Sequence, residues 1–157
     1  MPKLKPLEKF VCDECGKMIE KPENGYVEWY SEYYENKPNC IFGFRIVHHK
    51  PKSPKGSCYF EDNVRQSQGN QQSLSLNRCV GDMATARLLK ILELNYQNEN
   101  EFKNEKAHND FMDIFRRLTI PYYEEGRFYF DYQHELIGGY IGPGRYNKAQ
   151  MKKLIEL

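Results

Sequence analysis

Cysteine and histidine are the residues of this chain whose spacing points most clearly to chemistry. Cys12 and Cys15 are followed by Gly16, a pattern typical of a knuckle (residues 12–16) that wraps backbone N–H groups around a metal-bound sulfur. A histidine and a further cysteine follow roughly thirty residues later, which is the kind of second pair that completes a tetrahedral zinc site. The pattern therefore predicts one Zn²⁺ held by four side chains: Cys12, Cys15, His48 and Cys58.

Distance along a strand favours Cys58 over Cys40 as the last cysteine ligand. Residues 40–48 read as the strongest β-strand of the chain because apolar, aromatic and β-branched side chains fill it. About eight residues at roughly 3.3 Å each would place Cys40 about 26 Å from His48, too far for both to bind one ion. The turn signals that follow this strand would bring Cys58 back toward His48.

The two histidines are distinguished by the face of this strand on which each should lie. Alternate side chains share a face, which predicts one set composed of Cys40, Phe42, Phe44, Ile46 and His48. We expect the face of Phe44 and Ile46 to be the core face, so His48 is the preferred ligand. His49 stays open as the alternative to His48, because one inserted residue would reverse which face is buried.

The elements that must position these ligands follow from residue type and periodicity. A second strand over residues 26–30 would pair with 40–48 as an antiparallel hairpin, and the chain returns at 58–60. Apolar stripes at helical spacing predict one helix over 82–94 and another that ends near Leu118.

A change in composition over residues 66–77 to Gln, Asn, Ser and Gly is interpreted as a polar linker. It would separate a zinc-ribbon-like β module (1–65) from a helical domain (78–157). The predicted fold class is α+β, with a zinc-stabilised antiparallel β-hairpin module followed by a three- or four-helix C-terminal half.

Four motifs together resemble a little-characterised bacterial family of small proteins that carry an N-terminal zinc-ribbon-like module followed by a helical half. The motifs are CDECG at 12–16, GYVEW at 25–29, FRIVHH at 44–49 and RLTIPYYEE at 117–125. The resemblance implies a ribbon-plus-helices layout and supplies no activity. This chain has Gly126 where the family has Ala, so helix and strand both remain open for residues 122–132. A final helix is expected after Asn147, which can cap it.

Composition excludes several classes of protein. The net charge of +1 argues against a polyanion binder that acts through its overall field, and no apolar run approaches the roughly 18 residues of a membrane span. The N-terminus lacks the apolar region of a secretory signal. We therefore expect a cytoplasmic location, in a microbial cell or its phage, and five cysteines that serve as thiols and metal ligands.

An alternative reading is a metal-dependent nuclease. His48 and His49, with Asn63 about fifteen residues on, resemble the start of a His-Asn-His motif, in which a strand carries a general-base histidine. The motif is incomplete, because the next histidine is His108, on a predicted helix. Four protein ligands would close the metal site and leave no position for catalysis, so we expect no catalytic residues.

A basic segment with aromatic neighbours offers a surface for nucleic acid or for a protein partner. Its predicted contact residues are Arg45, Lys50, Lys52, Lys55, Trp29 and Tyr59. The opposite interpretation is a solvated hairpin whose strands pair opposite charges. The sequence thus favours a zinc-binding, non-enzymatic interaction module, of a regulatory or phage- or plasmid-related kind, and it specifies no oligomeric state.

Overall fold

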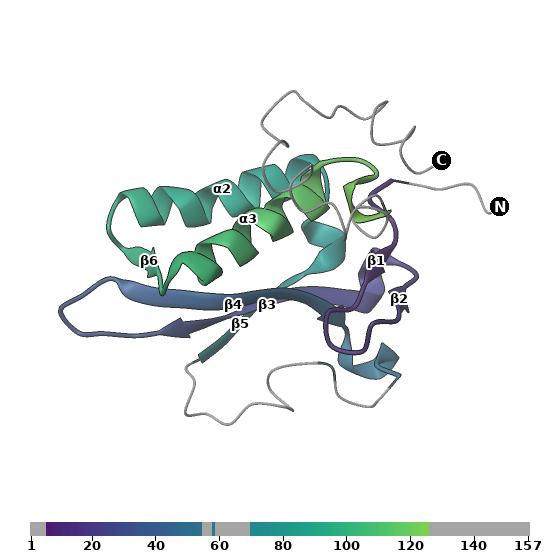
Figure 1. Cartoon of the computed structure of the whole chain (residues 1–157), viewed down its shortest axis with the longest axis horizontal. Coiled ribbons are helices and arrows are strands. Elements are labelled where there is room, and N and C mark those ends of the chain that lie inside the picture. Colours follow the sequence, from purple (N-terminus) through teal and green to yellow (C-terminus); the bar gives the residue numbers. More distant parts are fainter. Residues whose placement is uncertain (1–5, 55–57, 59–69, 126–157) are drawn as a thin grey trace.

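The computed structural model describes residues 6–54, 58 and 70–125, and every structural statement below concerns these residues (Figure 1). Three residues to which the sequence assigned a role, Lys55, Tyr59 and Asn63, lie outside them. The predicted helix after Asn147 and most of the open segment 122–132 lie outside them as well.

A four-stranded sheet with the order β5-β3-β4-β6 forms the base of the molecule. Its strands are β3 (Gly25–Glu32), β4 (Asn39–His48), β5 (Asn70–Ser75) and β6 (Asn100–Phe102). β3 is antiparallel to β4 and β5, whereas β6 is parallel to β4. A separate two-stranded ribbon, β1 (Phe10–Val11) with β2 (Met18–Ile19), lies at one end of the sheet (Figure 1).

A β-bulge in the middle of β4 decides which of its side chains face the core. Glu28 pairs with Arg45 and Tyr30 pairs with Phe42, so Gly43 and Phe44 together lie opposite one residue of β3. Gly43 has a φ of +74°, a left-handed conformation that glycine adopts without steric cost and that is typical of this kind of bulge. The extra residue reverses the side-chain alternation at this point.

The sequence predicted one shared face for alternate residues of this strand, and that prediction is wrong before the bulge. Cys40 and Phe42 lie on the face opposite to that of Phe44, Ile46 and His48. Ile41, not Phe42, is buried before the bulge, and Phe44, Ile46 and His48 are buried after it. The predicted parity of His48 holds because the bulge precedes Phe44 and leaves the rest of the strand regular.

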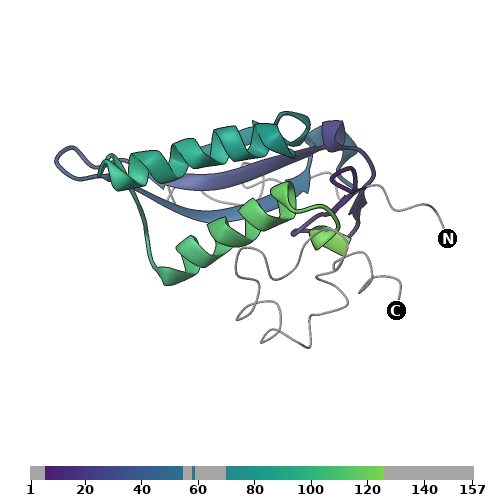
Figure 2. The same cartoon turned by 90° about the horizontal axis from the view of Figure 1, so that it is seen from above.

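Two helices cover one face of the sheet, α2 (Asp82–Tyr96) and α3 (Glu105–Thr119) (Figures 1 and 2). Asn104 caps α3, because its side-chain oxygen accepts a hydrogen bond from the N–H of Ala107 at 2.8 Å. The buried stripe of α3 includes Phe111, whose ring lies 5.2 Å from that of Phe44. The expected α+β class is confirmed.

One buried apolar cluster connects the ribbon, the sheet and both helices. Residues 70–75, which we expected in a polar linker, instead form β5 along the edge of β3. Their Asn, Gln and Ser side chains carry no apolar alternation, and the strand is half-exposed, so backbone pairing rather than side-chain burial defines it. β6 also lies in a stretch that reads as a polar connection. Short 3₁₀ turns complete the described part: η1 (Pro22–Asn24), η2 (Lys50–Lys52) and η4 (Leu76–Arg78).

Candidate metal centre

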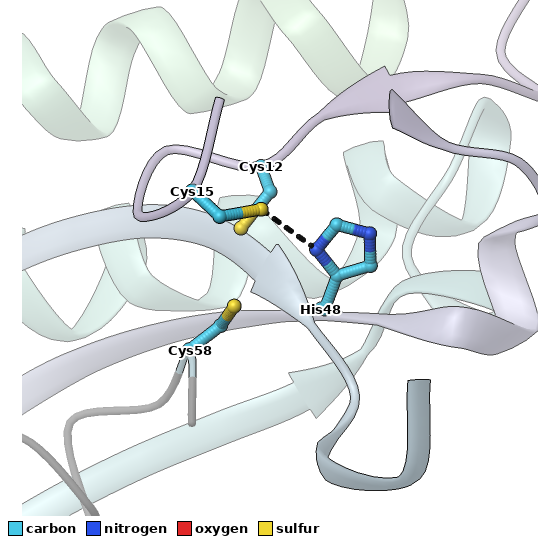
Figure 3. A group of neighbouring side chains, drawn as sticks. All are labelled: Cys12, Cys15, His48 and Cys58. Carbon is cyan, nitrogen blue, oxygen red and sulfur yellow. Dashed lines mark hydrogen bonds between the residues drawn. The ribbon is translucent and has the colours of Figure 1, made fainter. Parts of the chain in front are cut away.

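Four side chains from three separate segments converge at the end of the sheet nearest the ribbon (Figure 3). Cys12 and Cys15 come from the knuckle between β1 and β2, His48 ends β4, and Cys58 follows it in the chain. Their ligand atoms all lie within 4.8 Å of one another. A tetrahedral zinc site with Zn–S near 2.3 Å and Zn–N near 2.0 Å requires donor separations of roughly 3.5–3.8 Å. The cluster can therefore hold one metal ion with little adjustment.

The knuckle has a backbone conformation that directs both of its sulfurs to one point. Cys12 donates its N–H to the carbonyl of Lys17 at 2.9 Å, and Gly16 donates to the carbonyl of Cys12, also at 2.9 Å. Gly16 has a φ of +72°, so the turn between the two ligands and β2 depends on a left-handed residue. A side chain at position 16 would be strained by this conformation, although a Cβ there would meet no neighbouring atom.

His48 presents its Nδ1 atom to the cluster. Its Nε2 lies 3.1 Å from the carbonyl oxygen of Met18, which can only accept, so Nε2 carries the proton. Nδ1 then has a free lone pair, and it lies 3.4 Å from Sγ of Cys15 (Figure 3). A hydrogen bond from the second ring nitrogen is the usual way in which proteins orient a metal-binding histidine.

His49, the alternative ligand, lies outside the cluster. Its ring packs 4.9 Å from the ring of Tyr26, and its N–H donates to the carbonyl of Asn24 at 2.6 Å. Cys40 is also separate, because it belongs to the opposite end of β4 beside Glu32 and Glu101. The structure thus brings together the four residues that the sequence preferred, and it leaves out His49, the open alternative, and Cys40.

Burial favours the neutral thiol form of Cys12 when no cation is present. Burial raises the pKa of Cys12 to about 12, although backbone N–H groups of the knuckle oppose this effect. Ser53 donates its hydroxyl to Sγ of Cys58 at 2.9 Å. A bound divalent cation would instead favour the thiolate form, because a thiol that coordinates a metal ion is deprotonated outright.

Arg45 is one of two arginines that support the ligand-bearing segments. Its Nε donates to the fully buried Glu28 at 2.8 Å, and its Nη1 donates to Glu14 of the knuckle at 2.6 Å. Its Nη2 donates to the carbonyl of Cys58 at 2.9 Å. Arg45 thus connects the sheet to both cysteine-bearing segments, which is a different role from the nucleic-acid contact predicted for it.

Arg117 of α3 is the second supporting arginine, and sequence analysis did not identify it. Only 1% of its side chain is exposed, and it forms a bidentate pair with Glu124 through Nε (2.6 Å) and Nη2 (2.8 Å). Burial disfavours the charged guanidinium, but Glu124 and Asp13 outweigh that effect and raise the pKa of Arg117. An arginine on the buried stripe of a predicted helix, with acidic residues seven positions on, was the available signal.

A cleft of about 340 Å³ adjoins the knuckle between β4 and α3. Its charged lining residues include three cations, Arg45, Lys106 and Arg117. Each of them already forms an ion pair, with Glu14, Asp110 and Asp13 respectively. The cations of the described lining are therefore all paired with carboxylates of the protein itself.

The remaining predicted contact residues differ in accessibility. Trp29 stacks on Phe44 with ring centroids 5.4 Å apart, on the face that the helices cover. Lys50 and Lys52 belong to η2, and the side chain of Lys52 is exposed. Neither helix of the described residues combines the length and apolar character that a membrane span requires.

Comparisons of this chain with protein families, with curated proteins and with solved structures found no match. The zinc-ribbon-like family resemblance remains an expectation from the sequence motifs.

Proposed function

We propose that this protein is a non-enzymatic binding module built around a structural Zn²⁺. The observation that carries the proposal is the convergence of three cysteine sulfurs and one histidine nitrogen within 4.8 Å. Three thiolates and one imidazole are a donor set typical of structural zinc, and soft sulfur ligands disfavour Mg²⁺ and Ca²⁺. Four protein donors complete a tetrahedron, which supports a structural over a catalytic centre. Thiolate ligands also suit a reducing compartment, in keeping with the expected cytoplasmic location.

Metal analysis of the purified protein tests the zinc proposal directly. We expect about one zinc per chain, and a Co²⁺-substituted protein with the intense absorption of tetrahedral sulfur coordination. Cys12→Ser and Cys58→Ser should each lower the zinc content, whereas Cys40→Ser is the matched control because Cys40 lies outside the cluster. Zinc content that is equal in Cys40→Ser and Cys58→Ser would contradict the proposal.

For the interaction role we propose a protein partner rather than nucleic acid. The turn between β3 and β4 and the connection from α2 to β6 lie at the end of the sheet away from the metal centre (Figure 1). Tyr33 and Tyr34 of this turn are 73% and 44% exposed, and Tyr96, the last residue of α2, is 88% exposed. Tyrosine is among the residues enriched in protein interfaces, where it contributes large contact area at low entropic cost. The internal pairing of Arg45, by contrast, weakens the case for a phosphate-binding surface.

One titration distinguishes the classes of partner. Labelled single- and double-stranded oligonucleotides are added to the zinc-loaded protein at low salt, with and without Mg²⁺. We expect no strand cleavage. We also expect that Lys52→Glu does not weaken the binding of either oligonucleotide. Binding that Lys52→Glu reduces would instead support the nucleic-acid surface predicted from sequence. Cleavage that His49→Ala abolishes would support the nuclease alternative.

A further inference from the structure

The residues on both sides of Cys12 are bonded to one buried ion pair, through the backbone of Val11 and the side chain of Asp13. Val11 donates its N–H to Oε1 of Glu124 at 2.9 Å, and its carbonyl accepts from Nη2 of Arg117 at 3.0 Å. On the other side of Cys12, Asp13 accepts a hydrogen bond from Nη1 of Arg117 at 2.7 Å. Asp13 is also bonded to Ile46 of β4, whose N–H donates to the Asp13 carboxylate at 2.7 Å. Arg117 and Glu124 together therefore connect α3 and the segment after it to both neighbours of this ligand.

Glu124 reaches Arg117 only because the chain reverses direction after α3. Tyr122 has a φ of +67°, a conformation that a large side chain rarely adopts. Such a residue persists where the surrounding contacts hold it in place. Tyr122 and Tyr123 are buried, and the N–H of Tyr123 donates to the carbonyl of Ile120 at 3.1 Å. The chain thus turns at residues 120–122, with the strain at Tyr122, and continues into residues 123–125, which are helical. This whole segment is called the 120–125 turn below.

We propose that Arg117 is a positioning residue of the metal centre and that it couples metal binding to closure of the 120–125 turn. This inference rests on the proposed zinc function. A bound metal holds Cys12, and with it Val11 and Asp13, in the arrangement that Arg117 and Glu124 require. Loss of the metal removes that constraint and leaves the strained turn with weaker support. Because coupling between two sites is reciprocal, opening the turn also lowers metal affinity.

Zinc affinity of a variant of the full chain tests the coupling in one direction. Glu124→Gln keeps the shape of the side chain but removes the charge that faces Arg117. We expect zinc affinity, measured by competition with a chromophoric chelator, to fall roughly 10–100-fold, the usual effect of changing a group that orients metal ligands. Glu125→Gln is the matched control, because the neighbouring carboxylate makes no described bond to Arg117 or the knuckle. Equal zinc affinity in the two variants would overturn the inference.

Amide hydrogen exchange of the unaltered protein tests the other direction and does not depend on how well a variant folds. Removal of zinc should accelerate exchange at the Tyr123 amide, which contacts no metal ligand, by a factor comparable to the affinity loss of Glu124→Gln. Amides in the middle of α2, such as that of Leu88, should keep their exchange rates. Unchanged exchange at Tyr123 in protein that does bind zinc would refute the coupling and leave the zinc proposal intact. Protein that binds no zinc would contradict both.

Discussion

Phe44 and His48 lie four residues apart on the same face of β4, and they have different kinds of neighbour. Phe44 packs between Trp29 and Phe111, with ring centroids 5.4 and 5.2 Å away. His48 is surrounded by a backbone carbonyl and the sulfurs of the candidate metal centre. One region of the strand is stabilised by apolar packing that is complete within the chain, whereas the other has a donor set that a metal would complete.

This difference indicates where the free energy of folding comes from in each region. Apolar packing contributes through area removed from water and needs no ligand. The ribbon of β1 and β2, which carries the knuckle, has two-residue strands and a few buried side chains, such as Phe10 and Ile19, so it buries less apolar area. In so small a unit, the free energy of metal binding acts as free energy of folding.

Removal of the metal should produce the largest effect, and it should be confined to the metal end. Structural zinc binding is worth on the order of 10 kcal/mol in small modules, so chelation should destabilise the metal end strongly and expose the knuckle amides to exchange. Trp29 is the single tryptophan and stacks on Phe44, so its fluorescence reports on the packed region alone. We expect its emission wavelength to stay unchanged on chelation. A red shift would mean that the two regions unfold together.

Phe111→Ala should have the converse effect. Phe111 is fully buried against Phe44 and Phe102, and truncation of such a ring costs about 3–5 kcal/mol through lost burial and the cavity left behind. The midpoint of urea unfolding should fall accordingly, while the zinc content stays at one per chain. Met83→Ala, on the exposed side of α2, is the control and should change stability little. Loss of zinc from Phe111→Ala would show that the metal site depends on the packed region.

A buried thiol outside the metal cluster, that of Cys79, extends the comparison to pH. Burial raises the pKa of Cys79 to about 11 from an ordinary value near 9, and Cys79 lies outside the metal cluster. Because the unfolded chain loses this proton first, stability from Cys79 is complete below pH 9 and decreases as the pH rises through about 11. The decrease should amount to about 2–3 kcal/mol at most. Cys79→Ala should remove this part of the alkaline destabilisation, and a pH profile identical to that of the unaltered protein would contradict the assignment.

The ligand cluster was predictable because short-range patterns specify it. Cys12 and Cys15 form a local motif, and strand alternation selected His48 over His49. That alternation gave the correct face only because the bulge at Gly43 precedes Phe44, and a lone glycine in a strand does not say which way the register shifts. The same reasoning placed Phe42 on the wrong face.

The supporting groups were not predictable, because they depend on contacts between distant segments. Arg117 meets Asp13 across 104 positions of sequence, and no local periodicity encodes such a pair. β5 was missed for a related reason. Its polar residues form a strand only because β3 offers an unpaired backbone edge.

Glu14→Gln should have the smallest effect, although Glu14 lies inside the knuckle of the candidate metal centre. The Glu14 side chain is 36% exposed, and its ion pair with Arg45 is therefore screened by water. Arg45 keeps its bond to the fully buried Glu28, so no charge is left without a partner. We expect a stability change below about 1 kcal/mol and a zinc affinity within about threefold of the unaltered protein, in contrast to the change expected for Glu124→Gln. Urea unfolding and chelator competition on the two variants measure this contrast directly. Equal loss of zinc affinity in Glu14→Gln and Glu124→Gln would contradict this expectation. It would show that proximity to the metal matters more than burial of the ion pair.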